Sequence, residues 1–440
     1  MKNHGLIPLL EKAGLCLETL HRLALQTGFI RRRRQIQAAA FLVSLIAESI
    51  RGCVSCNDLA AIIETETGIG ASRQAYHQKM RDAGLRFLEA ILAKILSSKT
   101  LLALHSRFQR FQRILIQDST VIQLPSKLVK AFSGVGNAHV HVCNARIQLV
   151  FDLLSGCFTQ WSIDPYTKND IVSASELAVK AGDLVLRDRG YFTTDECERI
   201  QQARADFVSR YKHKTTLYDP QTGEELDLVR LLDTQRNLDQ WVAIGRDRKT
   251  PVRLVAIEVP QETAGRRRQK ARREYKGHNP SQAVLFLMGW TIFLTSLPSE
   301  AMPINSLIEL YGLRWKIEIL FKAWKSHLSF DKIHTVGAMQ LRLILIARFI
   351  AFLLLYEKLY VPLYLRVDQE SQKTLSILKL IRYISRNMQS IPRLLDALNR
   401  RGNGLRNLER YCTYDKRKRR NLIDKERIIL SAIEPMNVLN

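Results

Sequence analysis

The segment from about residue 110 to 211 constrains the fold most, because its hydrophobic pattern changes from strands alone to strands alternating with helices. Short apolar runs bounded by turn residues predict three consecutive strands and then two more. Helical spacing predicts a helix on each side of the fourth strand. The predicted strands are Arg113–Gln117, Ala145–Leu154, Cys157–Ile163, Asp183–Leu186 and Asp206–Tyr211, and the predicted helices are Ile171–Lys180 and Thr193–Ala203. This order is typical of an α/β fold with a mixed sheet.

The net charge points to the kind of partner. The chain has 67 Lys and Arg residues against 42 Asp and Glu residues, a formal charge of 67 − 42 = +25. Its hydrophobic content of 46% is that of a globular protein, which excludes a disordered or collagen-like chain. A positive excess of this size favours a polyanion, and we expect double-stranded DNA.

Neither a signal segment nor a membrane span is predicted. The sequence opens without a recognisable secretory or transit signal. The most apolar run, Leu343–Tyr356, is shorter than the ~20 residues that cross a bilayer, so we expect a buried helix there. The predicted location is the cytoplasm, without membrane contact. Cys53 and Cys56 have the spacing of half a zinc site, but no second pair follows, which leaves metal binding by these thiols open.

The rest of the chain divides around the α/β segment by its pattern. The predicted parts are a helical DNA-binding domain at 1–105, a core made of 106–211 and 301–335, a β-rich insertion at 212–300, and a helical C-terminal region at 336–440 with a basic tail. Residues 57–82 fit a helix-turn-helix, in which Asn57 caps the first helix and Ser72 caps a second that begins with Arg73. An ordinary amphipathic helix in a bundle explains this segment equally well.

Two aspartates follow apolar strands directly. Asp118 comes after Ile114–Ile116, and Asp188 comes after Leu184–Leu186. Open α/β sheets place their functional sites at the carboxyl ends of strands. A single aspartate in such a place is usually a turn or cap residue, so the pair is a candidate site only together with further residues.

A third acidic residue stands among cations on one predicted helix. At about 100° per residue, the members of this polar stripe fall within about 80° of arc: Tyr311, Arg314, Glu318, Lys322 and Lys325. The opposite side is apolar and suited to lie on a sheet. A salt-bridged surface helix is the alternative, although it explains less well why an aromatic hydroxyl shares the stripe.

These blocks resemble the motifs of the DDE transposases of bacterial insertion sequences, specifically the insertion-sequence-four family. The blocks are Asp118-Ser119-Thr120, Asp188-Arg189-Gly190-Tyr191-Phe192, and the pattern Tyr-x2-Arg-x3-Glu-x6-Lys at Tyr311, Arg314, Glu318 and Lys325. They occur in the family's order and span roughly residues 110 to 330. The resemblance implies an RNase H-like fold with a mostly β insertion between the last two acidic residues, which are 318 − 188 = 130 residues apart.

The resemblance also implies a chemistry. Asp118, Asp188 and Glu318 would bind Mg²⁺ or Mn²⁺, as two ions, and the enzyme would cut DNA at the element's ends and join the 3′ ends to target DNA. Many members cut the second strand through a hairpin. Tyr311, Arg314 and Lys325 match the family's residues for phosphate contact. A homodimer assembled on DNA is expected by analogy.

Further DNA contacts are expected outside the acidic blocks. Trp290 resembles the family tryptophan that stacks near an extruded base, although a strand tryptophan that fills the core is the competing interpretation. The basic run that includes Arg266, Arg267 and Arg268 favours phosphate contact over a solvated face. Two other functions stay open: an RNase H-like nuclease without strand transfer, and a transposase-derived DNA-binding regulator that has lost catalysis.

Overall fold

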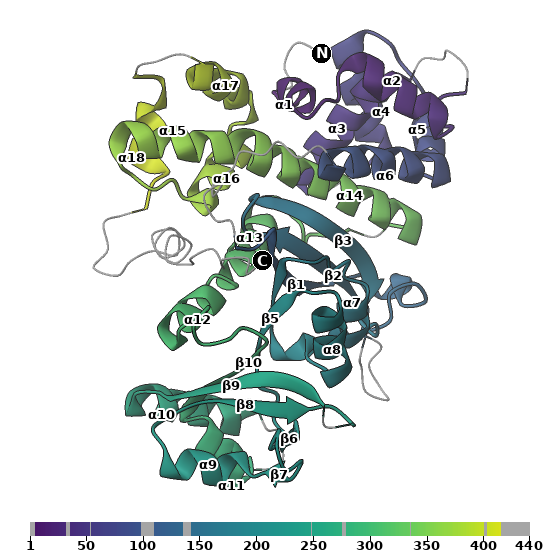
Figure 1. Ribbon diagram of the computed structural model, residues 1–440. Helices are drawn as coiled ribbons and strands as arrows, with labels where there is room; N and C mark the ends of the chain where they lie inside the picture. The colour runs from purple at the N-terminus through teal and green to yellow at the C-terminus, as the bar shows by residue number, and fades with distance from the viewer. Residues whose placement is uncertain are drawn as a thin grey trace.

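The computed structural model describes residues 5–31, 36–52, 54–97, 110–134, 142–247, 249–274, 279–334, 336–399 and 403–414. A central sheet separates two groups of helices from an insertion (Figure 1). The N-terminal and C-terminal helices lie together on one side, and the insertion lies at the far end of the sheet. Cys53, the basic tail and most of the basic run at 31–34 fall outside the described residues.

The sheet has the RNase H-like arrangement that the strand order predicted. Its first five strands lie in the order β3-β2-β1-β4-β5. β1, β2 and β3 pair antiparallel, whereas β4 is parallel to β1 and β5 is parallel to β4. The bounds are β1 Arg113–Gln123, β2 Asn144–Asp152, β3 Cys157–Pro165, β4 Asp183–Arg187 and β5 Asp206–Arg210.

The insertion continues this sheet. β10 (Trp290–Thr295) pairs antiparallel with β5 on one side and with β9 on the other, which gives ten strands in one sheet. The remaining strands are β6 Leu217–Tyr218, β7 Glu225–Leu226, β8 Asn237–Ile244 and β9 Thr250–Glu258. Three helices accompany them: α9 Leu228–Thr234, α10 Gln261–Glu274 and α11 Gln282–Leu287.

Two expectations for the insertion were wrong. Residues 285–297 were expected to be β-like throughout, but α11 occupies the first part and only β10 is a strand. The insertion is also less exclusively β than the sequence suggested, because α10 carries the basic run at 266–274 on a helix. Charged residues on a solvated helix leave no apolar period for a sequence pattern to detect.

The two faces of the sheet are covered by different helices. Alternate residues of β1 point to opposite faces, so Ile114 and Ile116 join the large core, whereas Leu115 joins the smaller one. α7 (Asp170–Ser175) and α8 (Thr194–Gln202) lie on the face of Leu115. α12 (Ile304–Gly312) and α13 (Trp315–His327) lie on the other face. The helix predicted over residues 171–180 is shorter than expected, since α7 ends at Ser175.

The N-terminal helices contain the two that the helix-turn-helix pattern predicted. They are α1 Leu6–Lys12, α2 Leu17–Gln26, α3 Ala38–Arg51, α4 Cys56–Thr67, α5 Arg73–Lys79 and α6 Asp82–Ser97. Ser72 caps α5 as predicted, by accepting a hydrogen bond from the amide of Ala75. The cap of α4 was predicted wrongly: Ser55 accepts the amides of Asn57 and Asp58, which places Asn57 inside the helix.

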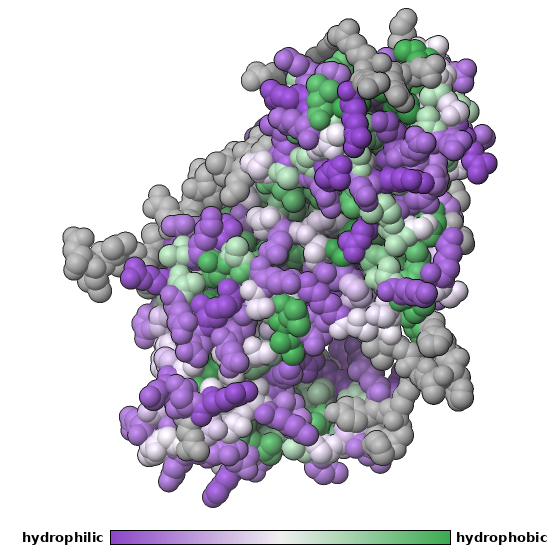
Figure 2. Space-filling model, turned by 90° about the vertical axis from the view of Figure 1, so that its right-hand side faces the viewer, coloured by the Kyte–Doolittle hydropathy of each residue, from purple (hydrophilic) through white to green (hydrophobic). Residues whose placement is uncertain are grey.

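The C-terminal helices are built around one apolar helix. They are α14 Ala338–Leu355, a π-helical turn at Tyr356–Tyr360, α15 Val361–Ser371, α16 Ile377–Arg386, α17 Ile391–Asn399 and α18 Arg406–Tyr411. In the described part of the chain, 338–371 is the one helical stretch long and apolar enough to cross a membrane, and 78% of its most apolar window is buried inside the protein. Hydrophilic side chains cover most of the face in Figure 2, with apolar residues scattered among them. The run at 343–356 is therefore the buried helix that was predicted.

Candidate active site

Strand register brings the two aspartates to the same level. β1 and β4 pair from Arg113↔Asp183 to Ile116↔Leu186, a constant offset of 70 residues. The same offset places Asp118 opposite Asp188, one step beyond the last parallel pair. Asp118 was expected to follow its strand, but β1 continues to Gln123 by pairing with β2 alone. The two carboxylates thus lie where β4 ends and β1 no longer has a parallel neighbour.

Glu318 joins this level through Arg314. The Arg314 guanidinium donates from Nη1 to Asp118 Oδ2 and from Nη2 to Glu318 Oε1, both at 2.7 Å. The polar stripe was expected on one continuous helix, but α12 ends at Gly312 and α13 starts at Trp315. Hydrogen bonds over three residues, such as the one from the Arg314 amide to the Tyr311 carbonyl, tighten the turn between them. Sequence spacing alone does not reveal this tight turn, because both residues keep helical dihedrals.

The three carboxylates influence one another. Burial raises the pKa of the Asp118 carboxyl to about 6, Arg314 and the Ser119 amide lower it, and the charges of Glu318 and Asp188 raise it. Burial lowers the pKa of the Arg314 guanidinium, but Tyr311 and the surrounding carboxylates raise it further, so the net direction is upward. The guanidinium therefore stays charged between acidic groups that repel each other.

Tyr311 and Lys325 lie at the same site from different helices. The Tyr311 hydroxyl donates to the carbonyl of Arg187 at 3.1 Å and lies 3.5 Å from Asp188 Oδ1. Lys325 Nζ donates to the carbonyl of Val121 at 2.8 Å, near the end of β1. Burial lowers the pKa of the Lys325 ammonium. The structure thus brings together five of the predicted residues: Asp118, Asp188, Tyr311, Arg314 and Glu318, with Lys325 beside them on α13.

The donor chemistry fits a hard divalent cation, although the carboxylates do not form a ready cage. Among the described residues, no group of three or more His, Cys, Asp or Glu side chains is placed to hold a metal ion. The reason is local: Arg314 occupies the space between Asp118 and Glu318. Carboxylate oxygens are the ligands that Mg²⁺ and Mn²⁺ prefer, and the Glu318 side chain is 34% exposed, which leaves it room to turn.

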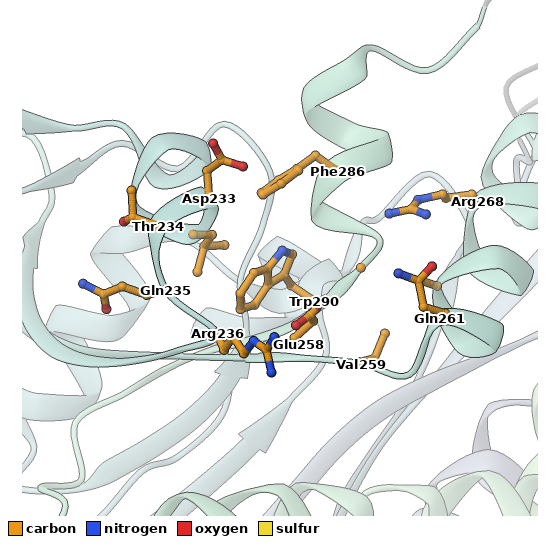
Figure 3. A pocket seen from close by; sticks show the side chains of 13 residues that line it. Asp233, Thr234, Gln235, Arg236, Glu258, Val259, Gln261, Arg268, Phe286 and Trp290 are labelled. Carbon is orange, nitrogen blue, oxygen red and sulfur yellow. The ribbon is translucent and has the colours of Figure 1, made fainter.

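Trp290 is nearly buried and lies between two cavities. It opens β10 with 8% of its surface exposed, and its ring lies 6.3 Å from that of Phe286. The first cavity, of about 370 Å³, is enclosed by α9, α10, α11 and the start of β10. Figure 3 shows the indole in the middle of the residues that line this cavity, with Phe286 above it and Arg268 to one side. Trp290 thus serves as part of the insertion's core while keeping one face toward open space.

The second cavity, of about 360 Å³, is basic on one side and apolar on the other. Its cations are Arg189, Arg210, Arg267 and Lys270, and its apolar lining is Val284, Leu287, Met288, Trp290 and Ile292. Burial lowers the pKa of Arg210, which interacts electrostatically with Tyr311 and with Asp188. This cavity therefore adjoins the carboxylate site, and sequence reasoning missed Arg210, whose only signal was its place at the end of a predicted strand.

The three arginines of α10 do not share one environment. Arg266 is 69% exposed at its side chain and lies 3.6 Å from Glu262. Arg267 donates to the Trp290 carbonyl at 2.8 Å, and Arg268 donates to the Leu285 carbonyl at 3.0 Å. The basic run was expected to act as a unit, but two of its members hold neighbouring backbone. Far from this site, Arg73 is exposed at the first position of α5.

Sequence reasoning also passed over Asp170, which was taken for a turn, cap or sheet-edge residue. The structure places it behind β1, next to Ser119 and therefore next to the candidate site. Its signal in the sequence was weak, because an aspartate at the start of a helix is common for capping reasons alone.

The chain matches known proteins over most of its length. Residues 109–354 match the family described as "Transposase DDE domain". The transposase for insertion sequence element IS231D of Bacillus thuringiensis subsp. finitimus is 27% identical, over 90% of this chain and 91% of that protein. The transposase for insertion sequence element IS1151 of Clostridium perfringens is 26% identical, over 78% of each chain.

A solved piggyBac transposase synaptic complex with hairpin DNA also aligns, at a TM-score of 0.41 and 11% identity, over 96% of this chain and 83% of that one. The family match covers more than half of the sequence and includes Asp118, Asp188 and Glu318, the three acidic residues that the fold brings to one level. The chain therefore belongs to the DDE transposases.

Proposed function

We propose that this transposase cuts DNA at the ends of an insertion sequence and joins the 3′ ends to target DNA, as a member of the insertion-sequence-four family. The observation that carries the proposal is the convergence of Asp118 and Glu318 on one guanidinium, with Asp188 at the same level of the sheet. Elements from three distant parts of the chain meet there. The printed names of the similar proteins, all insertion sequence transposases, support the substrate.

Asp118, Asp188 and Glu318 are the proposed ligands for Mg²⁺ or Mn²⁺, as a pair of ions. Such ions, when bound, activate the attacking water or 3′-hydroxyl and stabilise the leaving oxygen of an in-line displacement. The chain's own contribution is to hold the three carboxylates on a rigid sheet and a helix. No protein nucleophile is needed, so the carboxylates stay unmodified through the reaction.

Arg314, Tyr311 and Lys325 are proposed to contact the DNA phosphates beside the cut. Arg314 can grip a phosphate with two parallel hydrogen bonds once its carboxylate partners bind metal instead. Tyr311 already points its hydroxyl toward Asp188, so a phosphate near that carboxylate lies within its reach. Lys325 keeps a donor near the end of β1, and an ammonium with a lowered pKa is still charged at neutral pH.

The second strand is proposed to be cut through a hairpin on the transposon end. A sharp bend in the strand is relieved when a base leaves the stack, at a cost of a few kcal/mol. The cavity next to Asp188 has cations for a phosphate and an apolar lining that includes Trp290 for a base. This combination supports a role for the indole as the replacement stacking surface.

The N-terminal helices are proposed to bind the transposon ends, with Arg73 on α5 contacting DNA. α5 presents exposed polar side chains and packs on α4 in the manner of a recognition helix. We further propose a homodimer on paired ends, acting in the cytoplasm. Substitution of Arg73 by Ala is expected to weaken binding to end DNA, with nicking at saturating protein unchanged. Normal binding by that variant in a gel shift would contradict the assignment.

The proposal is tested by separating binding from cutting. Asp118→Asn, Asp188→Asn and Glu318→Gln are each expected to abolish Mg²⁺- or Mn²⁺-dependent nicking of a duplex that carries the DNA flanking the gene, while a gel shift stays unchanged. Asp164→Asn is the matched control, because Asp164 pairs with Lys168 on β3 away from the site. Nicking by Glu318→Gln at the wild-type rate would contradict the triad.

The same assay separates the alternative functions. A nuclease without strand transfer would nick but leave the 3′ ends unjoined in the presence of target plasmid. A regulator without catalysis would shift the DNA and never nick it.

A further inference from the structure

Asp170 is the centre of a polar cluster on the reverse face of the sheet from Asp118. Its Oδ1 accepts hydrogen bonds from Ser119 Oγ at 2.9 Å and from Gln148 Nε2 at 2.8 Å. Arg146 Nη1 lies 2.6 Å from the same oxygen. Three groups on β1 and β2 thus converge on one carboxylate of α7.

The register of the sheet explains why these residues meet. Ser119 lies opposite Gln148, and Val121 lies opposite Arg146, in the antiparallel pair of β1 and β2. Residues at alternate positions share a face, so the side chains of Ser119, Gln148 and Arg146 point together toward α7. Asp118, one residue earlier, points to the other face and to Arg314.

The cluster also reaches the second acidic block. Gln148 Oε1 accepts a hydrogen bond from the Tyr191 hydroxyl at 2.6 Å, and Tyr191 is buried three residues after Asp188. A Cβ placed on Gly190 would lie 3.2 Å from Asp170 Oδ2, which shows how closely the carboxylate approaches this turn. Asp170 is therefore in contact with both blocks that carry the proposed metal ligands.

Local helix capping does not account for Asp170. Asn169 is the N-cap of α7, and its side chain accepts the amide of Val172 at 3.0 Å. The Asp170 carboxylate is left for the cluster, with 22% of its side chain exposed. A residue needed only to start a helix would not gather Arg146, Gln148 and Ser119 from two strands.

We propose that Asp170 is a positioning residue for the metal site: through Ser119 it fixes Asp118, and through Gln148 and Tyr191 it fixes the turn that carries Asp188. This inference rests on the proposed role of those aspartates as metal ligands. Partners behind a metal ligand orient it, and their loss typically weakens metal affinity or activity about 10- to 100-fold. Asp170 itself touches neither the DNA nor the reacting atoms.

The test measures metal binding apart from catalysis. Asp170→Asn keeps the shape of the side chain but removes the charge that gathers the cluster. We expect it to weaken Mn²⁺ binding about 10- to 100-fold, measured as free Mn²⁺ by electron paramagnetic resonance on the full chain without DNA. Single-turnover nicking should need a correspondingly higher Mn²⁺ concentration, whereas the Kd for end DNA should stay within about twofold of wild type.

Two variants guard against a merely structural effect. Ser119→Ala removes a single contact of the cluster and should weaken Mn²⁺ binding less than Asp170→Asn, in the same direction. Asp164→Asn removes a carboxylate from the neighbouring strand β3 and should leave Mn²⁺ binding unchanged. All proteins are compared well below their unfolding temperatures, so that the measured affinity belongs to folded molecules.

Two results would overturn the inference: wild-type Mn²⁺ affinity in Asp170→Asn, or full recovery of affinity in the double variant Arg146→Gln/Asp170→Asn. Recovery would mean that an unpaired Arg146 charge, rather than lost positioning, caused the defect. Asp118→Asn serves as the reference. If it too binds Mn²⁺ like the wild type, the proposed metal site itself is wrong, and that result is distinct from a failure of Asp170 alone.

Discussion

Arg314 Nη1 lies 2.7 Å from Asp118 Oδ2, and the two residues are 196 positions apart in the chain. The same guanidinium holds Glu318, so one cation neutralises two of the three proposed metal ligands. Cation and metal compete for the same oxygens. The carboxylates must therefore exchange Arg314 for metal before cutting, and the exchange frees Arg314 for a phosphate.

Replacement of Arg314 by Gln should separate these two roles. Mn²⁺ binding without DNA is expected to tighten about tenfold, equivalent to ~1.4 kcal/mol, because the competing charge is gone. Single-turnover nicking should nevertheless slow, since the phosphate loses its bidentate partner. Calorimetric titration with Mn²⁺ and a nicking time course measure the two effects. Weaker Mn²⁺ binding in this variant would show that Arg314 organises the carboxylates instead of competing for them.

The arginines of α10 should differ in what they contribute. Arg266→Gln is expected to reduce the slope of log affinity against log salt by about 0.9, the value for one phosphate contact, without changing the unfolding temperature. Arg267→Gln should also lower the unfolding temperature, because the Trp290 carbonyl and Thr291 hydroxyl lose their donor. Gel shifts over a salt series and thermal melts provide both numbers. An unchanged slope for Arg266→Gln would mean that its side chain only faces solvent.

Trp290 is expected to act after the first nick. Trp290→Ala should slow hairpin closure roughly ten- to a hundredfold, equivalent to ~1–3 kcal/mol of lost stacking, while first-strand nicking is largely kept. Trp290→Phe, which preserves the packing on Phe286, should recover part of the rate. Trp241, 42% exposed on β8, is the matched control for loss of an indole from the insertion. Equal loss of nicking and hairpin formation in Trp290→Ala would mark the residue as core alone.

A buried glutamate in the π-helical turn makes stability depend on pH. Burial raises the pKa of Glu357 to about 7 from an ordinary value of 4.5, although Lys358 Nζ at 3.8 Å lowers it. The native state therefore holds this proton more tightly than the unfolded chain, and the stability it contributes is full below pH 4.5 and lost as the pH rises through about 7.

Glu357→Gln mimics the protonated form. It should raise the unfolding temperature at pH 8, where the wild type loses at most about 3 kcal/mol through this group, and change little at pH 5. Thermal melts of both proteins across pH 5–8 test the sign. A variant that is less stable than the wild type at pH 8 would show that the Lys358 pairing outweighs burial.

The sequence predicted the sheet and the site to different depths. Apolar runs with turn residues located β1 to β5, and the RNase H-like order of the sheet is confirmed. The functional roles assigned to Asp118, Asp188 and Glu318 stay predictions, as do those of Tyr311, Arg314 and Lys325. What the sequence could not provide was register, because an offset of 70 residues between β1 and β4 depends on tertiary packing.

Other errors have local causes. Asn57 and Ser55 are both good capping residues two positions apart, and only the tertiary contacts of α4 decide between them. The break between α12 and α13 follows from a tight turn that keeps helical dihedrals, so it does not disturb the periodicity of the segment. Asp170 escaped notice because its partners come from two strands that pair only in the folded sheet.

The sheet order has a consequence for the nascent protein. β5 finds its second neighbour only in β10, and Glu318 lies 318 − 118 = 200 residues after Asp118. At roughly 5–20 residues per second, the ribosome needs about 10–40 s to synthesise that interval. During this time the chain already carries both aspartates and much of its positive charge, so it can attract DNA without the third carboxylate. Binding competence therefore precedes cutting competence while the protein is made, close to the gene that encodes it.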